Sequence, residues 1–174
     1  MVTVVVLGTV VLLLIVYAFW TASRLDRLHA RVDAAAAALD AQLRARADAA
    51  TRCGTDCPLT PSVAADLERS AAAARDVSGL GHDREEVENA LSRALTDVDG
   101  DVAGTPAGFA IADAATRASF ARRFHNDAVR DVLVVRRRRI VRYLRLAGRA
   151  PLPSYFEMVE PVMSGTPAGV SSAD

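Results

Sequence analysis

The sequence predicts an all-α protein: an N-terminal transmembrane helix followed by an antiparallel bundle of about four helices, of which the first and last are long. Residues 2–20 carry no charge and are almost wholly apolar, and beyond them apolar residues recur every three or four positions. No run of residues alternates apolar and polar side chains as a strand would. We therefore divide the chain into a transmembrane anchor (1–22), a helical bundle domain (23–149) and a disordered tail (150–174) containing proline and glycine.

The anchor is predicted from the length of the apolar run. About 20 apolar residues in a helix rise roughly 30 Å, which matches the hydrocarbon core of a bilayer. Tyr17, Phe19 and Trp20 stand where an interfacial aromatic belt would place them. A cleaved signal peptide is the alternative, but no basic stretch precedes the run, the run is too long, and the residues after Trp20 make a poor cleavage site.

The placement of arginines predicts the orientation of the anchor. No arginine precedes the apolar run, whereas Arg24, Arg27 and Arg31 follow it closely. Because the more basic flank of a transmembrane helix usually faces the cytoplasm, we expect a single-pass protein of the inner or plasma membrane with a cytoplasmic domain.

The first two helices of the domain are bounded by glycine and proline. No glycine or proline lies between Gly8 and Gly54, so the anchor should continue unbroken into the first helix, which residues 51–58 interrupt. Thr60 followed by Pro61 is typical of a helix start, and the glycines in residues 78–81 end this second helix.

Two further helices complete the predicted bundle. Asp83 can cap a third helix whose apolar stripe extends to Val98, and the glycine-rich residues 99–108 predict a loop. A fourth, long helix is expected over residues 111–146. Its broad apolar face should contain Phe120, Phe124, Ala128, Val132 and Val135.

The residue inventory argues against an enzyme, a cofactor and a metal. All 21 basic residues are arginines, which excludes Schiff-base and P-loop lysine chemistry. Cys53 and Cys57 lack the further ligands that zinc needs, because the histidines are scattered. The two cysteines are compatible with a disulfide outside the cytoplasm, with free thiols inside it, or with no role.

Two stretches of the domain resemble the LemA family of bacterial membrane-anchored helical proteins. Residues 31–48 read RVDAAAAALDAQLRARAD, and residues 121–130 read ARRFHNDAVR; residues 88–95 are a weaker third match. The chain has Ala36 where the family usually carries tryptophan and His125 where it carries tyrosine, so it resembles a divergent member. The resemblance implies a membrane-tethered helical bundle in a bacterial inner membrane, without an established enzymatic activity.

Polar residues on the first and fourth helices are candidates for an interhelical polar layer that sets the register of the bundle. A paired-charge catalytic site is the alternative, but the helper groups for acid–base or nucleophilic work are missing. The candidate residues are Arg31, Asp33, Asp40, Arg123, Asn126 and Asp127.

An arginine cluster near the end of the fourth helix is the candidate contact for anionic lipid or for a partner. Residues 113–149 contain eleven arginines and three acids. In an alternating bundle this cluster returns to the membrane, where each arginine contributes roughly 1 kcal/mol on an anionic leaflet. The candidates are Arg136, Arg137, Arg138, Arg139, Arg142 and Arg145.

These features predict a membrane-anchored, non-enzymatic scaffold or protein-interaction module with an unidentified protein partner. They are also compatible with a homo-oligomer. The alternative is a membrane-tethered protein that binds nucleic acid through the arginine-rich helix. That alternative is less favoured because the cluster lacks the interleaved aromatic side chains of single-strand binders; only Tyr143 is near.

Overall fold

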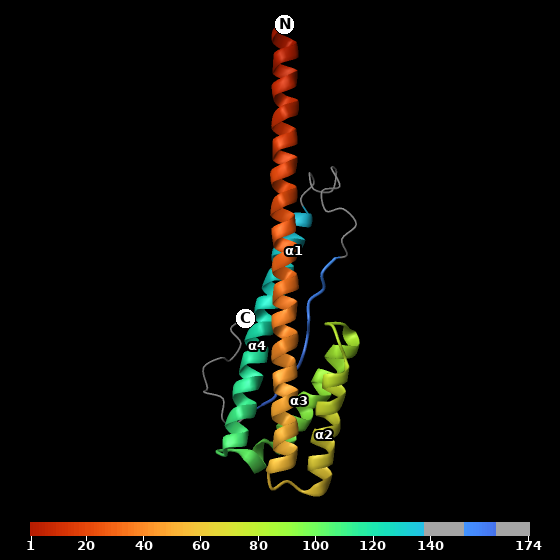
Figure 1. Ribbon diagram of the computed structural model, residues 1–174, viewed down its shortest axis with the longest axis vertical. Helices are drawn as coiled ribbons and strands as arrows, with labels where there is room; N and C mark the ends of the chain where they lie inside the picture. Colours follow the sequence, from red (N-terminus) through yellow and green to blue (C-terminus); the bar gives the residue numbers. More distant parts are fainter. Residues whose placement is uncertain (138–151, 163–174) are drawn as a thin grey trace. The chain divides into compact units, whose positions relative to one another are not determined.

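The computed structural model describes residues 1–137 and 152–162, and these residues are helical apart from short links and one extended segment (Figure 1). The helices are α1 (Val2–Asp56), α2 (Pro61–Asp76), α3 (His82–Val102) and α4 (Pro106–Arg136). The all-helical class is thereby confirmed for the described part of the chain. The chain divides into two compact units, Met1–Ala35 with His125–Tyr155 and Ala36–Phe124 with Phe156–Asp174, and each unit is described by itself.

Helix α1 contains the predicted anchor and runs for 55 residues without a break. Of the helices described, it is the one long and apolar enough to cross a membrane, and none of its most apolar eighteen-residue window is buried in the protein. Leu7, Leu13 and Ile15 are each more than half exposed. An apolar surface of this extent indicates contact with a membrane or another apolar partner. The orientation of the helix stays a prediction.

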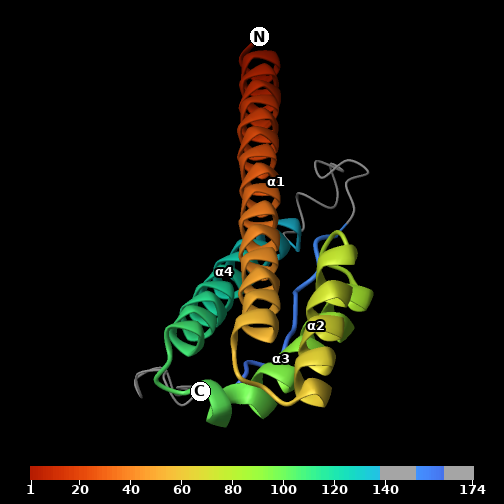
Figure 2. The same ribbon diagram turned by 60° about the horizontal axis from the view of Figure 1, so that its bottom comes forward.

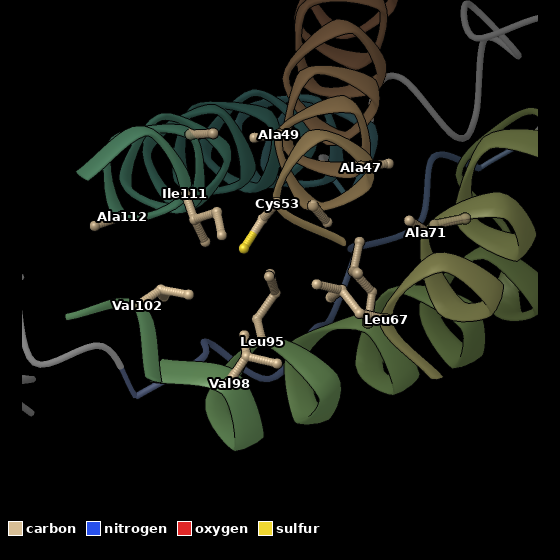
Figure 3. Close-up of a cluster of buried hydrophobic side chains, with 14 residues drawn as sticks. Ala47, Ala49, Cys53, Leu67, Ala71, Leu95, Val98, Val102, Ile111 and Ala112 are labelled. Carbon is tan, nitrogen blue, oxygen red and sulfur yellow. The ribbon is translucent and has the colours of Figure 1, made fainter. Parts of the chain in front are cut away.

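The core of the second unit is built largely from small side chains, which allow close contact between helices. Figure 3 shows side chains from four helices pointing toward one another. Leu67 and Leu95 fill much of the space, and α2 packs beside α3 (Figure 2). The buried members are Ala47, Ala49, Ala50, Cys53, Leu67, Ala71, Ala74, Leu91, Leu95, Val98, Val102, Ile111, Ala112 and Ala114.

The loop expected over residues 99–108 is much shorter in the structure. Helix α3 continues to Val102 and α4 begins at Pro106. The Thr105 hydroxyl accepts a hydrogen bond from the Gly108 backbone N–H at 3.1 Å, as a helix N-cap does. A Cβ at Gly108 would lie 2.3 Å from the Val102 carbonyl oxygen, so this tight connection needs glycine. Helix α1 likewise extends to Asp56, through most of residues 51–58 that were expected to interrupt it.

The apolar face predicted for α4 is only partly correct. Ala128, Val132 and Val135 are buried, in the first unit, against Leu25 and Val32 of α1. The two phenylalanines predicted on the same face, in the second unit, are exposed: Phe120 by 46% and Phe124 by 66%. Buried positions nearby on α4 include Ala114, Ala115 and Ala118. Ala118 packs in a cluster with Leu39, Leu43 and Phe156, so its small side chain leaves room for larger side chains from other segments.

The tail predicted to be disordered contains an ordered part. Residues 152–162 are extended (Figures 1 and 2). Phe156 and Met158 are buried in a cluster with Leu39, Leu43 and Ala118. Alternate residues of an extended chain face the same side, so Phe156 and Met158 point inward together. The packed domain therefore extends beyond the boundary predicted at residue 149. The rest of the predicted tail, residues 163–174, lies outside the described residues.

Candidate functional site

A fully buried ion-pair network joins α1 and α3 within the second unit. The side chains of Arg46, Arg84 and Glu88 are each 0% exposed. One Glu88 carboxylate oxygen lies 2.5 Å from Arg46 Nη2, and the other accepts a hydrogen bond from Arg84 Nε at 2.8 Å. Glu88 therefore bridges two arginines through its two oxygens, the geometry that makes ion pairs strong.

Neighbouring groups compensate the remaining charge and several of the remaining donors of the network, whereas Arg46 Nε and Arg84 Nη2 have no hydrogen-bond partner among the described residues. Asp40 Oδ1 lies 3.3 Å from Arg84 Nη1, so two carboxylates face two guanidinium groups. Arg84 Nη1 also donates to the Val77 carbonyl that follows α2. Arg46 donates to the Glu88 carbonyl and to the Ser92 hydroxyl, each at 3.1 Å. The three central side chains are sealed from solvent, and their contacts join α1 to α3.

Helix periodicity places these groups on one face of α3. Arg84, Glu88 and Ser92 are spaced by four residues, so their side chains lie one above the other. Leu91 and Leu95 of the core follow on nearly the same face. The network thus replaces the first part of an apolar stripe with paired charges.

The same helix binds the C-terminal segment, which we define as residues 156–162. Ser92, which receives the hydrogen bond from Arg46, donates its own hydroxyl proton to the Val159 carbonyl at 2.7 Å. The Val159 backbone N–H donates to Asn89 Oδ1 at 2.7 Å, and that of Glu157 donates to Glu85 Oε1 at 2.8 Å. The Val162 N–H reaches Thr96 Oγ1 at 3.3 Å. The segment is therefore attached to α3 through its main chain.

An ionic contact to α4 also holds the segment. Glu160 Oε1 accepts hydrogen bonds from Ser119 Oγ at 2.5 Å and from Arg122 Nη2 at 2.7 Å, and Arg123 lies 3.8 Å away. Burial by itself would raise the pKa of Glu160. The hydrogen bonds from Ser119 and Arg122, together with the two positive charges, outweigh it and lower the pKa of Glu160 below its usual value.

The residues predicted to form a polar layer are described unit by unit. In the second unit, Asp40 pairs with Arg44 at 2.9 Å and joins the buried network, and in the first unit Arg31 pairs with Asp131 at 3.1 Å. Asp33 is exposed, Asn126 is half-buried, Asp127 pairs with Arg130 within α4, and Arg123 lies over the Phe120 ring and near Glu160.

The predicted arginine cluster is described only at its start. Arg136 is half-buried and Arg137 is exposed. The rest of the cluster lies outside the described residues: Arg138, Arg139, Arg142 and Arg145.

The cysteines lie close together at the end of α1. Cys53 Sγ is 2.8 Å from Cys57 Sγ, and both thiols are free in the structure. Burial is the main reason that the pKa of Cys53 rises to about 12, so this thiol is unreactive at neutral pH.

Sequence reasoning missed Arg84, Glu88 and Ser92 because it compared only the first and last helices. A signal was present in the chain: Arg84 and Glu88 occupy the stripe that Leu91 and Leu95 continue. A charged pair four residues apart on an apolar stripe predicts a buried ion pair and not a solvated one.

Comparisons of the chain with protein-family models, with curated proteins and with solved structures found no match. The resemblance to the LemA family accordingly stays a prediction from sequence. Within residues 1–137 and 152–162, no group of three or more His, Cys, Asp or Glu side chains is placed to hold a metal ion.

Proposed function

We propose that this chain is a single-pass membrane protein whose helical domain, an antiparallel bundle of the LemA type, is a non-enzymatic scaffold for protein partners. The observation that carries the proposal is the unbroken course of α1. Its apolar first part is wholly unburied, whereas Leu39, Leu43 and Ala47 of the same helix are 0% exposed. In this proposal one helix supplies both a membrane anchor and part of the core of a packed domain.

The use of polar groups supports a scaffold over an enzyme. The most strongly interacting charges, Arg46, Arg84 and Glu88, are sealed inside the domain and paired with one another. Glu160 is occupied by Ser119 and Arg122. These contacts position helices and the C-terminal segment, which is the work of a structural protein.

The anchor can be tested by extracting membranes from cells that express the full chain. Wild-type protein should stay in the membrane fraction after alkaline carbonate treatment. Replacing Leu13 by arginine should release much of it, because a central arginine costs roughly 2.5–3.5 kcal/mol on the insertion scale. The matched Leu13→Ala variant should stay membrane-bound. Wild-type chain recovered in the carbonate supernatant would contradict the proposal.

The cytoplasmic orientation can be tested with the two native cysteines. A membrane-impermeant thiol reagent should label Cys57, which is partly exposed, only after the cells are permeabilised. Labelling of Cys57 in intact cells would place the domain on the extracytoplasmic side of the membrane. In that case the arginine cluster would not face the anionic cytoplasmic leaflet.

A further inference from the structure

The contacts of the C-terminal segment are those of a bound peptide. Side chains at positions 85, 89, 92 and 96 of α3 form hydrogen bonds with the backbone of Glu157, Val159 and Val162. Such bonds fix the register of an extended chain without depending on its side chains, which is how peptide-binding domains gain affinity.

Three side chains of the segment supply specificity. Phe156 is 0% exposed and Met158 is 8% exposed, in a cluster with Leu39, Leu43 and Ala118. Glu160 binds Ser119 and Arg122. The intervening side chain of Val159 is 61% exposed and contributes little. The site therefore selects an apolar residue, a second apolar residue two positions later, and an acid two positions after that.

We propose that this face of the domain is a recognition site for an extended peptide of the pattern apolar-x-apolar-x-acid, that residues 156–162 occupy it in cis, and that a partner protein carrying such a segment displaces them. We call it the segment-binding face: Glu85, Asn89, Ser92 and Thr96 of α3, Ser119 and Arg122 of α4, and Leu39, Leu43 and Ala118 of the core. The inference rests on the proposed scaffold function and specifies the chemistry of its partner.

A foreign segment fits this role better than a second copy of the chain. The tethered segment acts at an effective concentration of about a millimolar, so an identical segment from another copy competes only near that concentration. A partner needs better contacts than those of the cis segment. Exposed positions such as Val159 and Val162, at 61% and 76%, leave room for such improvement.

The test uses the full chain in detergent micelles and a fluorescein-labelled peptide of residues 153–162. Replacing Val159 by proline removes the N–H that binds Asn89 and leaves Phe156 and Met158 unchanged, so the cis segment should detach. By fluorescence anisotropy, this variant should bind the wild-type peptide roughly tenfold more tightly than the wild-type chain does. The matched Val159→Ala variant keeps the N–H and should behave like wild type.

A second variant protects the test against a folding defect in the first. In Glu160→Lys the new ammonium group faces Arg122 and Arg123, which should release the cis segment through an exposed position. This chain should also gain affinity for the wild-type peptide.

Substitutions in the peptide and in the face test specificity. A peptide carrying Phe156→Asp should bind neither variant, and an Arg122→Glu chain should prefer a Glu160→Lys peptide. Equal binding by wild-type and both released chains, with unchanged helicity, would overturn the proposal.

Two further outcomes would also overturn it. Binding of a scrambled peptide as tight as that of the wild-type peptide would show that the face does not select this pattern. A wild-type chain that dimerises at micromolar concentration and dissociates when peptide is added would identify a second copy as the occupant. Peptide binding in micelles does not depend on insertion in a membrane, so a failure of the anchor and a failure of the segment-binding face are separately visible.

Discussion

Helix α1 contributes an arginine to an ion pair in each unit. The two pairs consist of the same chemical groups but differ strongly in how far their side chains are exposed. In the second unit, Arg46 lies 2.5 Å from Glu88 and both side chains are 0% exposed. In the first unit, Arg31 lies 3.1 Å from Asp131, with side chains 59% and 47% exposed. The same pairing of arginine and carboxylate thus occurs both in a sealed core and in solvent.

The difference shows that burial, more than distance, decides what an ion pair does. A buried pair has lost its hydration, and only a complete set of partners compensates for that loss. An exposed pair keeps most of its hydration and gains little from the contact. The buried network therefore specifies how α1 and α3 fit together, whereas the exposed pair should be almost dispensable.

Removing one member of the buried network should have the largest effect of any single substitution. Glu88→Ala leaves Arg46 and Arg84 charged and without their carboxylate, which should lower the free energy of unfolding by about 3–5 kcal/mol. Urea denaturation followed by circular dichroism measures this change. A loss below 1 kcal/mol would show that water reaches the arginines and would remove the basis of the comparison.

Replacing the whole network tests whether uncompensated charge explains the instability expected for Glu88→Ala. The triple variant Arg46→Met, Arg84→Met and Glu88→Leu removes the three sealed charges and leaves Asp40, which is partly exposed, paired with Arg44. Its stability should therefore lie well above that of Glu88→Ala and near that of wild type. If the triple variant were as unstable as Glu88→Ala, packing and not charge compensation would explain the effect.

The same comparison between buried and exposed positions applies to apolar residues in the second unit. Leu43 is 0% exposed, so Leu43→Ala should cost about 2–5 kcal/mol of the free energy of unfolding. Phe124 is 66% exposed, so Phe124→Ala should change it by less than about 0.5 kcal/mol although it removes a larger side chain. Thermal or urea unfolding measures both losses. A larger loss for Phe124→Ala than for Leu43→Ala would mean that Phe124 is packed.

The sequence was sufficient to predict the elements that local rules determine. The long apolar first part of α1 follows from an uncharged run of apolar residues, and the start of α2 at Pro61 follows from the preceding Thr60. Thr105 before Pro106 is the same signal, and reading it would have shortened the predicted loop before α4. Helix boundaries of this kind can be predicted from the neighbouring residues alone.

Features that depend on contacts between helices were not predictable in this way. Phe124 has the periodicity of a core position, but alanines of α4 face the interior instead, where Leu39, Leu43 and Phe156 from other segments fill the space beside Ala118. The C-terminal segment contains only Phe156 and Met158 as an alternating pair, too short to stand out among prolines. Its order comes from hydrogen bonds to α3, about seventy residues earlier in the chain.

Acid should weaken the attachment of the C-terminal segment before it disrupts the helices. The pKa of Glu160 is below its usual value when the segment is bound, so the ionised form stabilises attachment above the pKa of the free carboxyl group. This contribution is lost as the pH falls through the lowered pKa. The protection of the Glu157 and Val159 amides from hydrogen exchange, measured relative to the intrinsic exchange rate at each pH, should therefore fall on acidification, and the Glu160→Gln variant should not show that pH dependence. Protection factors with the same pH dependence in both chains would assign the effect to another group.

The exposed pair of the first unit should give the smallest effect. Replacing Arg31 by alanine removes its contact with Asp131 but leaves that carboxylate solvated, so the free energy of unfolding should change by at most about 1 kcal/mol. The difference should shrink as salt is added, because mobile ions screen exposed charges within about 8 Å at physiological ionic strength. A double-mutant cycle with Asp131→Ala isolates the pair from other effects of either substitution. A coupling energy above about 2 kcal/mol that persists in high salt would mean that this pair is as desolvated as Arg46 and Glu88, and the contrast between the two units would then fail.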